Sequence, residues 1–387
     1  MIQGKPFATS DKFKEDPVFG TSWQRDTQGM SFKKELKGRF CTNLFTKFEV
    51  NNYGDVWMCC PSWLPFNIGN LFENSVEEIW NGPRARELRN QVFTDDWKYC
   101  NHEYCPLIAS NTLPTQNEIV NKSERKYIDS QSTLIDELPT YINFCNDSSC
   151  NLQCPSCRVH FISNVSGKEY EKSKILNDKL VDYFLTKPTE RRFTIGVTGS
   201  GDPFGSKIFR DMLIGIDGKK FPNLYINLTT NGVMFTPKMW NLISGIHQNL
   251  SDIEISFDAG VKHTYETKTR IGGKWELLLE NCKHLDTQVI NFPNIRPNYN
   301  FVVQKDNYKE ISKYVNLILN NFPNANSIKF QLLADWGTWD KSTFDSKAIW
   351  KESHPEYREF LSYLKDPILK HPKVELGNLF NHYKLAN

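Results

Sequence analysis

Three cysteines lie close together in the chain, in the run Cys150-Asn151-Leu152-Gln153-Cys154-Pro155-Ser156-Cys157, with the spacing CxxxCxxC. Thiolates spaced in this way are typical metal ligands, and an iron–sulfur cubane normally takes four of them. Three cysteines in one tight loop, with no fourth close behind, would leave one iron open to a ligand that the protein does not supply. Zinc is the alternative, because a CxxC pair is also a common half of a zinc site.

A second group of cysteines precedes the first. Cys41 is followed after twelve residues by Gly54, Cys59 comes after four more, and Cys100 and Cys105 follow later. Gly54 suits a hairpin turn that would direct Cys59 back toward Cys41. Four thiolates can complete a cubane or a tetrahedral zinc site, and the sequence does not separate the two. Cys60 is an alternate ligand in this group.

Composition and charge exclude several classes of protein. The 387 residues include 47 Lys and Arg against 45 Asp and Glu, and 39% are hydrophobic, which is enough for a sizeable core and argues against disorder. The net charge of +2 gives no basic footprint for a nucleic-acid backbone, so we expect no nucleic-acid partner. No apolar run approaches the ~18 residues that span a bilayer, and the polar start has no hydrophobic signal segment. These features predict a soluble, cytoplasmic protein that does not bind membranes.

Changes in composition along the chain predict five segments. The predicted segments are an irregular N-terminal arm at 1–38, a cysteine-rich unit at 39–108, a polar linker at 109–137, a repeated strand–helix region at 138–335 and a C-terminal helical extension at 336–387. In the cysteine-rich unit, Ser75 and Glu78 have the spacing of a helix capping box.

The region 138–335 alternates short apolar runs with amphipathic segments, which is typical of βα units around a parallel sheet. The predicted strands are 140–144, 193–198, 224–229, 252–257, 299–303 and 327–333, and the predicted helices between them are 170–185, 207–216, 237–247, 274–284 and 308–320. Because right-handed crossovers all turn the same way, six consecutive units predict an α/β fold with a partial (βα)6 barrel.

Polar residues follow several of these strands, where the loops of a barrel build active sites. The second strand ends in Ser200-Gly201-Asp202-Pro203, the third in Thr230-Asn231, and the fourth in Ser256 and Asp258. A glycine lets the backbone approach a ligand closely, and a carboxylate accepts hydrogen bonds from an ammonium group. A phosphate-binding loop is disfavoured because the glycine spacing misses GxGxxG by one residue. A plain βα turn remains open, and Asp258 either faces the site or caps the next helix.

The region from Leu138 to Leu333 resembles the radical S-adenosylmethionine superfamily, whose signature is CxxxCxxC after the first strand of a partial barrel. The resemblance implies that Cys150, Cys154 and Cys157 hold a [4Fe-4S] cluster. Its open iron would bind S-adenosylmethionine, and reductive cleavage would give a 5′-deoxyadenosyl radical that abstracts a substrate hydrogen. Ser156 departs from the family, which usually has an aromatic residue before the last cysteine.

The same resemblance implies roles for the residues at the strand ends. Ser200-Gly201-Asp202-Pro203 is similar to the family's Gly-Gly-Glu-Pro motif, which implies that Asp202 holds the methionine amine. Thr230-Asn231 is similar to the family's Thr-Asn-Gly, and Ser256 matches a serine that commonly touches the nucleoside or the carboxylate of the cofactor.

The cysteine-rich unit resembles the SPASM and shorter twitch domains, which carry auxiliary [4Fe-4S] clusters in many radical enzymes. Its Gly-x4-Cys spacing, Gly69-Asn70-Leu71 and Ile79-Trp80 carry the resemblance. It precedes the barrel instead of following it, and the seven-cysteine SPASM pattern is incomplete. The resemblance implies a second cluster on Cys41, Cys59, Cys100 and Cys105.

Together these resemblances imply an enzyme that abstracts hydrogen from a substrate, which we expect to be a peptide. A dehydrogenase or epimerase of a small alcohol or sugar is the alternative within the family, and a non-catalytic iron–sulfur or zinc protein is the alternative outside it. The expected partners are the substrate and an electron donor such as flavodoxin or ferredoxin.

Overall fold

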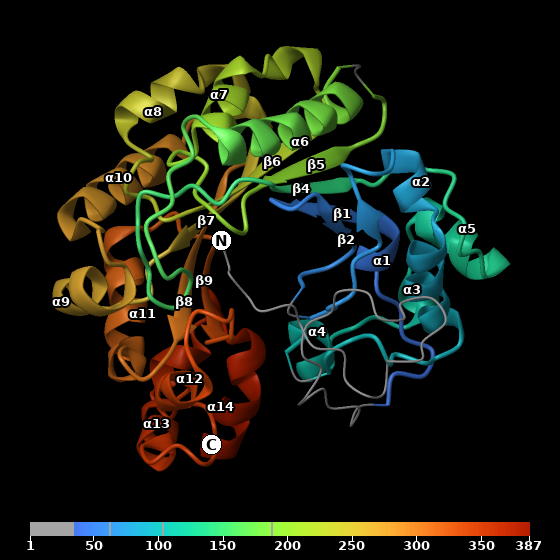
Figure 1. Cartoon of the computed structure of the whole chain (residues 1–387). Helices are drawn as coiled ribbons and strands as arrows, with labels where there is room; N and C mark the ends of the chain where they lie inside the picture. Colours follow the sequence, from blue (N-terminus) through green and yellow to red (C-terminus); the bar gives the residue numbers. More distant parts are fainter. Residues whose placement is uncertain (1–34, 62, 103, 187–188) are drawn as a thin grey trace.

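One mixed sheet of ten strands runs through the computed structural model, which describes residues 35–387 except 62, 103, 187 and 188 (Figure 1). The strand order is β10-β9-β8-β7-β6-β5-β4-β1-β2-β3. The α/β class is therefore confirmed. Most of the predicted arm, residues 1–34, lies outside the described residues.

The six predicted strands of the repeated region are present as β4 to β9, which are neighbours in the sheet and all parallel. Their bounds lie within three residues of the predicted ones: β4 Tyr141–Cys145, β5 Phe193–Val197, β6 Leu224–Thr230, β7 Leu250–Ser256, β8 Arg296–Val303 and β9 Ser327–Leu332. Closure of these strands into a partial barrel stays a prediction.

The helices between these strands lie on one side of the sheet (Figure 1). They are α6 Lys168–Phe184, α7 Lys207–Gly215, α8 Pro237–Leu242, the short α9 Lys262–Thr264, α10 Trp275–Gln288 and α11 Ile311–Asn321. The helix predicted over 237–247 is shorter, because α8 ends at Leu242 and a 3-10 helix follows from Ser244. Ser244 and Gly245 are weak helix formers, which accounts for the break.

The two faces of the parallel strands differ in chemistry. One face is apolar and at most 1% exposed, with Ile142, Phe144, Ile195, Val197, Ile226, Leu228, Ile253, Ile255, Tyr299, Phe301, Ile328 and Phe330. The opposite face, here called the polar face, carries Tyr141, Asn143, Thr194, Tyr225, Asn227, Thr229, Glu254, Ser256, Asn300 and Lys329, all half-buried. Parallel sheets are usually apolar on both faces. The polar face therefore needs polar surroundings, which water or a polar ligand can supply.

The cysteine-rich unit extends this sheet. β1 (Lys47–Asn51) pairs in parallel with β4, and a hairpin joins it to β2 (Asp55–Trp57), which pairs with β3 (Gly69–Asn70). Gly54 has a φ of +81°, as the predicted turn requires. The helices of the unit are α1 Asn43–Thr46, α2 Val76–Trp80, α3 Pro83–Phe93 and α4 Pro106–Ala109. The predicted capping box is present at the start of α2, where Ser75 and Glu78 bond reciprocally.

The segment 109–137, predicted as a linker, is a packed part of the described structure. It contains α5 (Lys122–Ser130), whose Tyr127 and Ile128 are buried. The buried Arg89 ties it to the rest of the unit by donating to the backbone oxygen of Thr133 at 3.0 Å. Its polar composition concealed this helix, because only a few apolar residues face the core. The division into domains stays a prediction.

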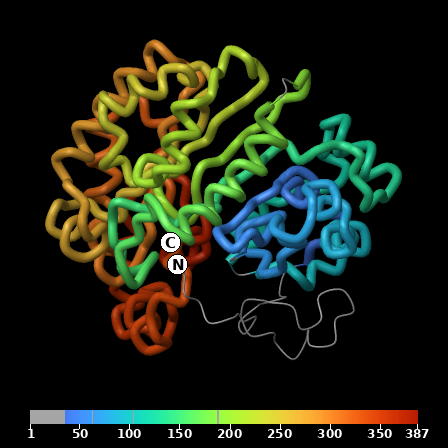
Figure 2. The backbone as a smooth tube through the Cα atoms, turned by 45° about the horizontal axis from the view of Figure 1, so that its top comes forward, coloured from blue at the N-terminus to red at the C-terminus, as the bar shows by residue number. Residues whose placement is uncertain are grey.

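The C-terminal residues pack at the other end of the sheet. β10 (Val374–Glu375) pairs in parallel with β9, and the C-terminal helices are α12 Lys341–Lys347, α13 Tyr357–Tyr363 and α14 Phe380–Ala386. Figure 2 shows this red segment and the blue cysteine-rich unit on different sides of the parallel strands. No helix of the described residues is both long and apolar enough to cross a bilayer.

Candidate functional site

The loop after β4 gathers Cys150, Cys154 and Cys157, here called the cysteine triplet. Cys150 and Cys154 form a buried cluster with Leu152, and the half-buried Cys157 packs against this cluster. Burial raises the pKa of the Cys150 thiol to about 12, and it also raises the pKa of Cys154. Burial favours the neutral form of these two thiols, so metal loading of Cys150 and Cys154 would release protons.

Each thiol of the triplet receives a hydrogen bond from a different side chain. Asn231 Nδ2 lies 3.7 Å from Cys150 Sγ. Arg270 Nη1 lies 3.6 Å from Cys154 Sγ, and Arg158 Nη2 lies 3.5 Å from Cys157 Sγ. N–H donors and two cations at these distances stabilise thiolates, which are the form that binds metal. The donor set therefore fits an iron–sulfur group held by three thiolates.

Asp258 holds one of these donors in place. Its Oδ2 lies 2.6 Å from Arg270 Nη2, and its Oδ1 accepts a hydrogen bond from Val302 N at 2.7 Å. Both side chains of the ion pair are largely buried. Because Asp258 acts on the triplet through Arg270, its position agrees better with facing the site than with capping the next helix. Neither Arg270 nor Arg158 was predicted as a site residue, although Arg158 directly follows Cys157 in the chain.

Asp202 joins the ends of β5 and β6. It is 1% exposed, and its Oδ2 accepts hydrogen bonds from Thr230 Oγ1 and Asn231 N, both at 2.8 Å. Its Oδ1 accepts from Phe204 N and Gly205 N, both at 3.0 Å. The structure thus brings three predicted site residues together. The predicted contact of Asp202 with an ammonium group would have to replace one of these four bonds.

The neighbouring residues pack the β5 loop onto the cysteine loop. Ser200 Oγ donates to the backbone oxygen of Cys145 at 2.8 Å, and Pro203 is buried. A Cβ on Gly201 would lie 2.5 Å from Ser149 O and 2.7 Å from Asp147 O. The close approach predicted for Gly201 is therefore made to the backbone of the cysteine loop.

Gly201→Ala is expected to lower the free energy of unfolding by about 1–3 kcal/mol, because the new methyl group meets two backbone oxygens that cannot rotate away. Gly215→Ala is the matched control, since a Cβ there meets no atom within 4 Å. Chemical denaturation of both variants checks the difference. Equal stability of the two variants would contradict the close packing of the loops.

Ser256 ends β7 on the polar face. It is half-buried and pairs in register with Asn300 of β8. The side-chain oxygen of Asn300 is buried and has no hydrogen-bond partner among the described residues. A buried acceptor without a partner is costly, so this part of the polar face suits a ligand that donates a hydrogen bond.

The second group, Cys41, Cys59, Cys100 and Cys105, is here called the N-terminal cysteine group. Burial and, to a smaller extent, the nearby Cys105 thiol raise the pKa of Cys41 to about 12. Burial also raises the pKa of Cys59, where Cys41 and Cys105 add to the rise, and the pKa of Cys100, where Cys105, Cys41 and Cys59 add to it. These mutual effects show that the four thiols share one buried environment. Cys60 adds to the rise at Cys59 and Cys105, so it lies close to the group as well.

Within residues 35–387, apart from the four positions left out, no three His, Cys, Asp or Glu side chains could together hold one ion. A zinc site needs its four sulfurs about 2.3 Å from one point. A cubane attaches each thiolate to a different iron, so its ligands stand farther apart.

The two cysteine groups lie toward opposite ends of β1 and β4. Cys59 follows β2, and because β2 runs antiparallel to β1, Cys59 lies near the start of β1. The triplet instead follows the end of β4, which runs parallel to β1. Polar side chains line the strands between them. Lys47 Nζ lies 2.8 Å from Glu49 Oε2, and Asn143 Nδ2 donates to Glu49 Oε2 at 3.0 Å and to Cys145 Sγ at 3.2 Å.

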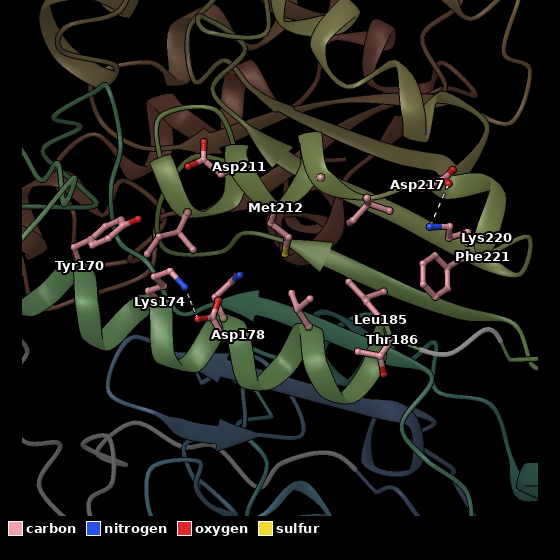
Figure 3. A pocket seen from close by; sticks show the side chains of 15 residues that line it. Tyr170, Lys174, Asp178, Leu185, Thr186, Asp211, Met212, Asp217, Lys220 and Phe221 are labelled. Atoms are coloured by element: carbon pink, nitrogen blue, oxygen red, sulfur yellow. Dashed lines mark hydrogen bonds and ion pairs between the residues drawn. The ribbon is translucent and has the colours of Figure 1, made fainter.

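The pocket of about 480 Å³ drawn in Figure 3 lies elsewhere, between α6 and α7. Tyr170, Lys174 and Met212 are among its lining residues, and none of the predicted site residues lines it. This pocket lies on the helical side of the sheet. The predicted site residues gather instead in the loops that follow β4, β5 and β6, and this loop region is therefore the candidate site.

Residues 41–106 match the SPASM family model, an iron–sulfur cluster-binding domain. The matched range contains all four cysteines of the N-terminal cysteine group. Iron–sulfur binding by this unit is thereby supported over zinc, and SPASM domains occur in radical S-adenosylmethionine enzymes. No curated protein matches the chain.

Proposed function

We propose that the chain is a radical S-adenosylmethionine enzyme with an auxiliary-cluster domain before its core. The observation that carries the proposal is the cysteine triplet at the end of β4, with each thiol bonded by its own N–H donor. When bound, S-adenosylmethionine at the open iron of a [4Fe-4S] cluster supplies a 5′-deoxyadenosyl radical that takes a hydrogen atom from the substrate. The SPASM match supports the same enzyme class.

The residues of the chain would position the cofactor in this proposal. Cys150, Cys154 and Cys157 hold the cluster, while Asp202 fixes Thr230 and Asn231 at the adjoining strand ends. Ser200-Gly201-Asp202-Pro203 would line the methionine part of the cofactor, and Ser256 its nucleoside or carboxylate. The six parallel strands would form the partial (βα)6 barrel of residues 138–335.

The N-terminal cysteine group would hold a second [4Fe-4S] cluster. Four thiolates leave no iron open for a cofactor, so this cluster would carry electrons or orient the substrate. Its position at the far end of β1 and β4 puts the polar residues of those strands between the two groups. Reducing electrons would come from a flavodoxin or ferredoxin.

The polar face favours a peptide substrate. Its amides at Asn143, Asn227 and Asn300 both donate and accept hydrogen bonds, as the backbone of a peptide does. Lys329 Nζ and Glu254 Oε1, 2.6 Å apart, form an ion pair that places one positive and one negative charge on the polar face. These groups would also bind a small alcohol or sugar, which is the alternative substrate class.

Electron paramagnetic resonance of the reduced, anaerobic protein tests the proposal. Addition of S-adenosylmethionine is expected to change the spectrum of one cluster, because an open iron gains a ligand. The variant without the three triplet cysteines should show a spectrum that the cofactor leaves unchanged. A wild-type protein with iron but no response to the cofactor would indicate a non-catalytic iron–sulfur protein, and zinc without iron a structural binding module.

A further inference from the structure

Two arginines contact the cysteine triplet, the buried Arg158 and the half-buried Arg270. Arg158 is 5% exposed, and its Nη2 lies 3.5 Å from Cys157 Sγ. The side chain of Arg270 is 14% exposed, and its Nη1 lies 3.6 Å from Cys154 Sγ. Guanidinium groups stay charged in proteins, so two of the three thiols have a permanent cation beside them.

Both guanidinium groups are held in place by other parts of the chain. Arg158 donates to Ser148 O and to Ser200 O, each at 2.8 Å. Arg270 is paired with Asp258, which is itself fixed by Val302 N. Nε of Arg270 is buried without a hydrogen-bond partner among the described residues. The cations are therefore preorganised, and Arg270 keeps a donor for a further negative group.

The charge around the two arginines differs. The carboxylate of Asp258 offsets much of the charge of Arg270, whereas no carboxylate of the described residues forms an ion pair with Arg158. Charges interact strongly in a site of low water content, because the effective dielectric constant is well below that of water. Arg158 should therefore exert the larger effect on a group held by the triplet.

We propose that Arg158 and Arg270 raise the reduction potential of the cluster on the cysteine triplet, a role that rests on the proposed function. Reduction adds one electron, delivered by a flavodoxin or ferredoxin, and makes the cluster with its thiolates one unit more negative. Nearby cations stabilise that added charge. By raising the reduction potential of the cluster, the two arginines allow a biological electron donor to reduce it.

Redox titration of the full-length protein, followed by electron paramagnetic resonance, tests this role. The signal that responds to S-adenosylmethionine identifies the cluster. Arg158→Gln and Arg270→Gln are expected to lower the equilibrium constant for its reduction at least tenfold, which is about 59 mV toward negative potential for one electron. Arg158→Gln should cause the larger shift. Arg270→Lys, which keeps the charge, should stay closer to the wild type than Arg270→Gln.

Arg296→Gln is the matched control. Arg296 pairs with Asp252 at 2.6 Å, as Arg270 does with Asp258. Arg296 is the first residue of β8, however, so it lies at the amino-terminal ends of the parallel strands, away from the triplet. Its loss should leave the potential unchanged. Unchanged potentials in both glutamine variants would overturn the inference, as would an equal shift in Arg270→Lys and Arg270→Gln.

Iron content separates the remaining outcomes. Loss of iron from the glutamine variants but not from Arg270→Lys would support the inference, because the thiolates would then need the cation. Loss from Arg270→Lys as well would overturn it, since charge alone would not suffice. A wild-type protein without a signal that responds to the cofactor would instead refute the proposed function itself.

Discussion

Replacing Cys150, Cys154 or Cys157 by alanine is expected to abolish formation of 5′-deoxyadenosine from S-adenosylmethionine. Three thiolates leave one iron of a cubane open, so removal of any one releases the cluster or leaves a second iron without a protein ligand. Anaerobic incubation with a strong reductant, followed by chromatography of the nucleosides, measures the product.

Cys282→Ala is the control for this series. Cys282 is a buried thiol on α10 that lies outside both cysteine groups. Its loss leaves a small cavity and should lower stability without lowering the yield of 5′-deoxyadenosine. A yield like that of the wild type in any of the three triplet variants would remove the triplet from the chemistry.

Replacing the whole N-terminal cysteine group by alanine is expected to halve the iron content, from about eight to about four irons per chain. The cysteine triplet would keep its cluster, since it lies at the other end of β4. Slow cleavage of S-adenosylmethionine should therefore persist, while turnover of the substrate should stop. Iron analysis and the yield of 5′-deoxyadenosine give both readings.

Cys60→Ala is the matched variant for this second prediction, because Cys60 lies close to the group but is not one of the four matched ligands. It should keep about eight irons per chain. Unchanged iron after loss of the four cysteines would show that this unit carries no cluster. Loss of half the iron from Cys60→Ala would show that Cys60 is a ligand.

The sequence predicted the elements whose patterns are local. The strands of the repeated region were predicted because short apolar runs alternate there with amphipathic segments, and β4 to β9 begin and end within three residues of the predicted ranges. The start of α2 was predicted because a capping box needs only Ser75 and Glu78 at the right spacing.

Contacts between distant residues could not be predicted in this way. Arg270 reaches Cys154 across 116 residues, and no local pattern marks an arginine as a partner of a thiol. The four hydrogen bonds to Asp202 come partly from the next strand, so its burial was not evident from its own loop. The helix α5 was read as a linker because Tyr127 and Ile128 supply little apolar signal on their own.

Formation of 5′-deoxyadenosine by the wild-type protein tests the central claim most directly. The protein, loaded with iron and sulfide without oxygen, is reduced and mixed with S-adenosylmethionine. We expect 5′-deoxyadenosine and methionine in equal amounts, with none from the variant that lacks Cys150, Cys154 and Cys157. A protein that carries its full iron content and forms no 5′-deoxyadenosine would contradict it.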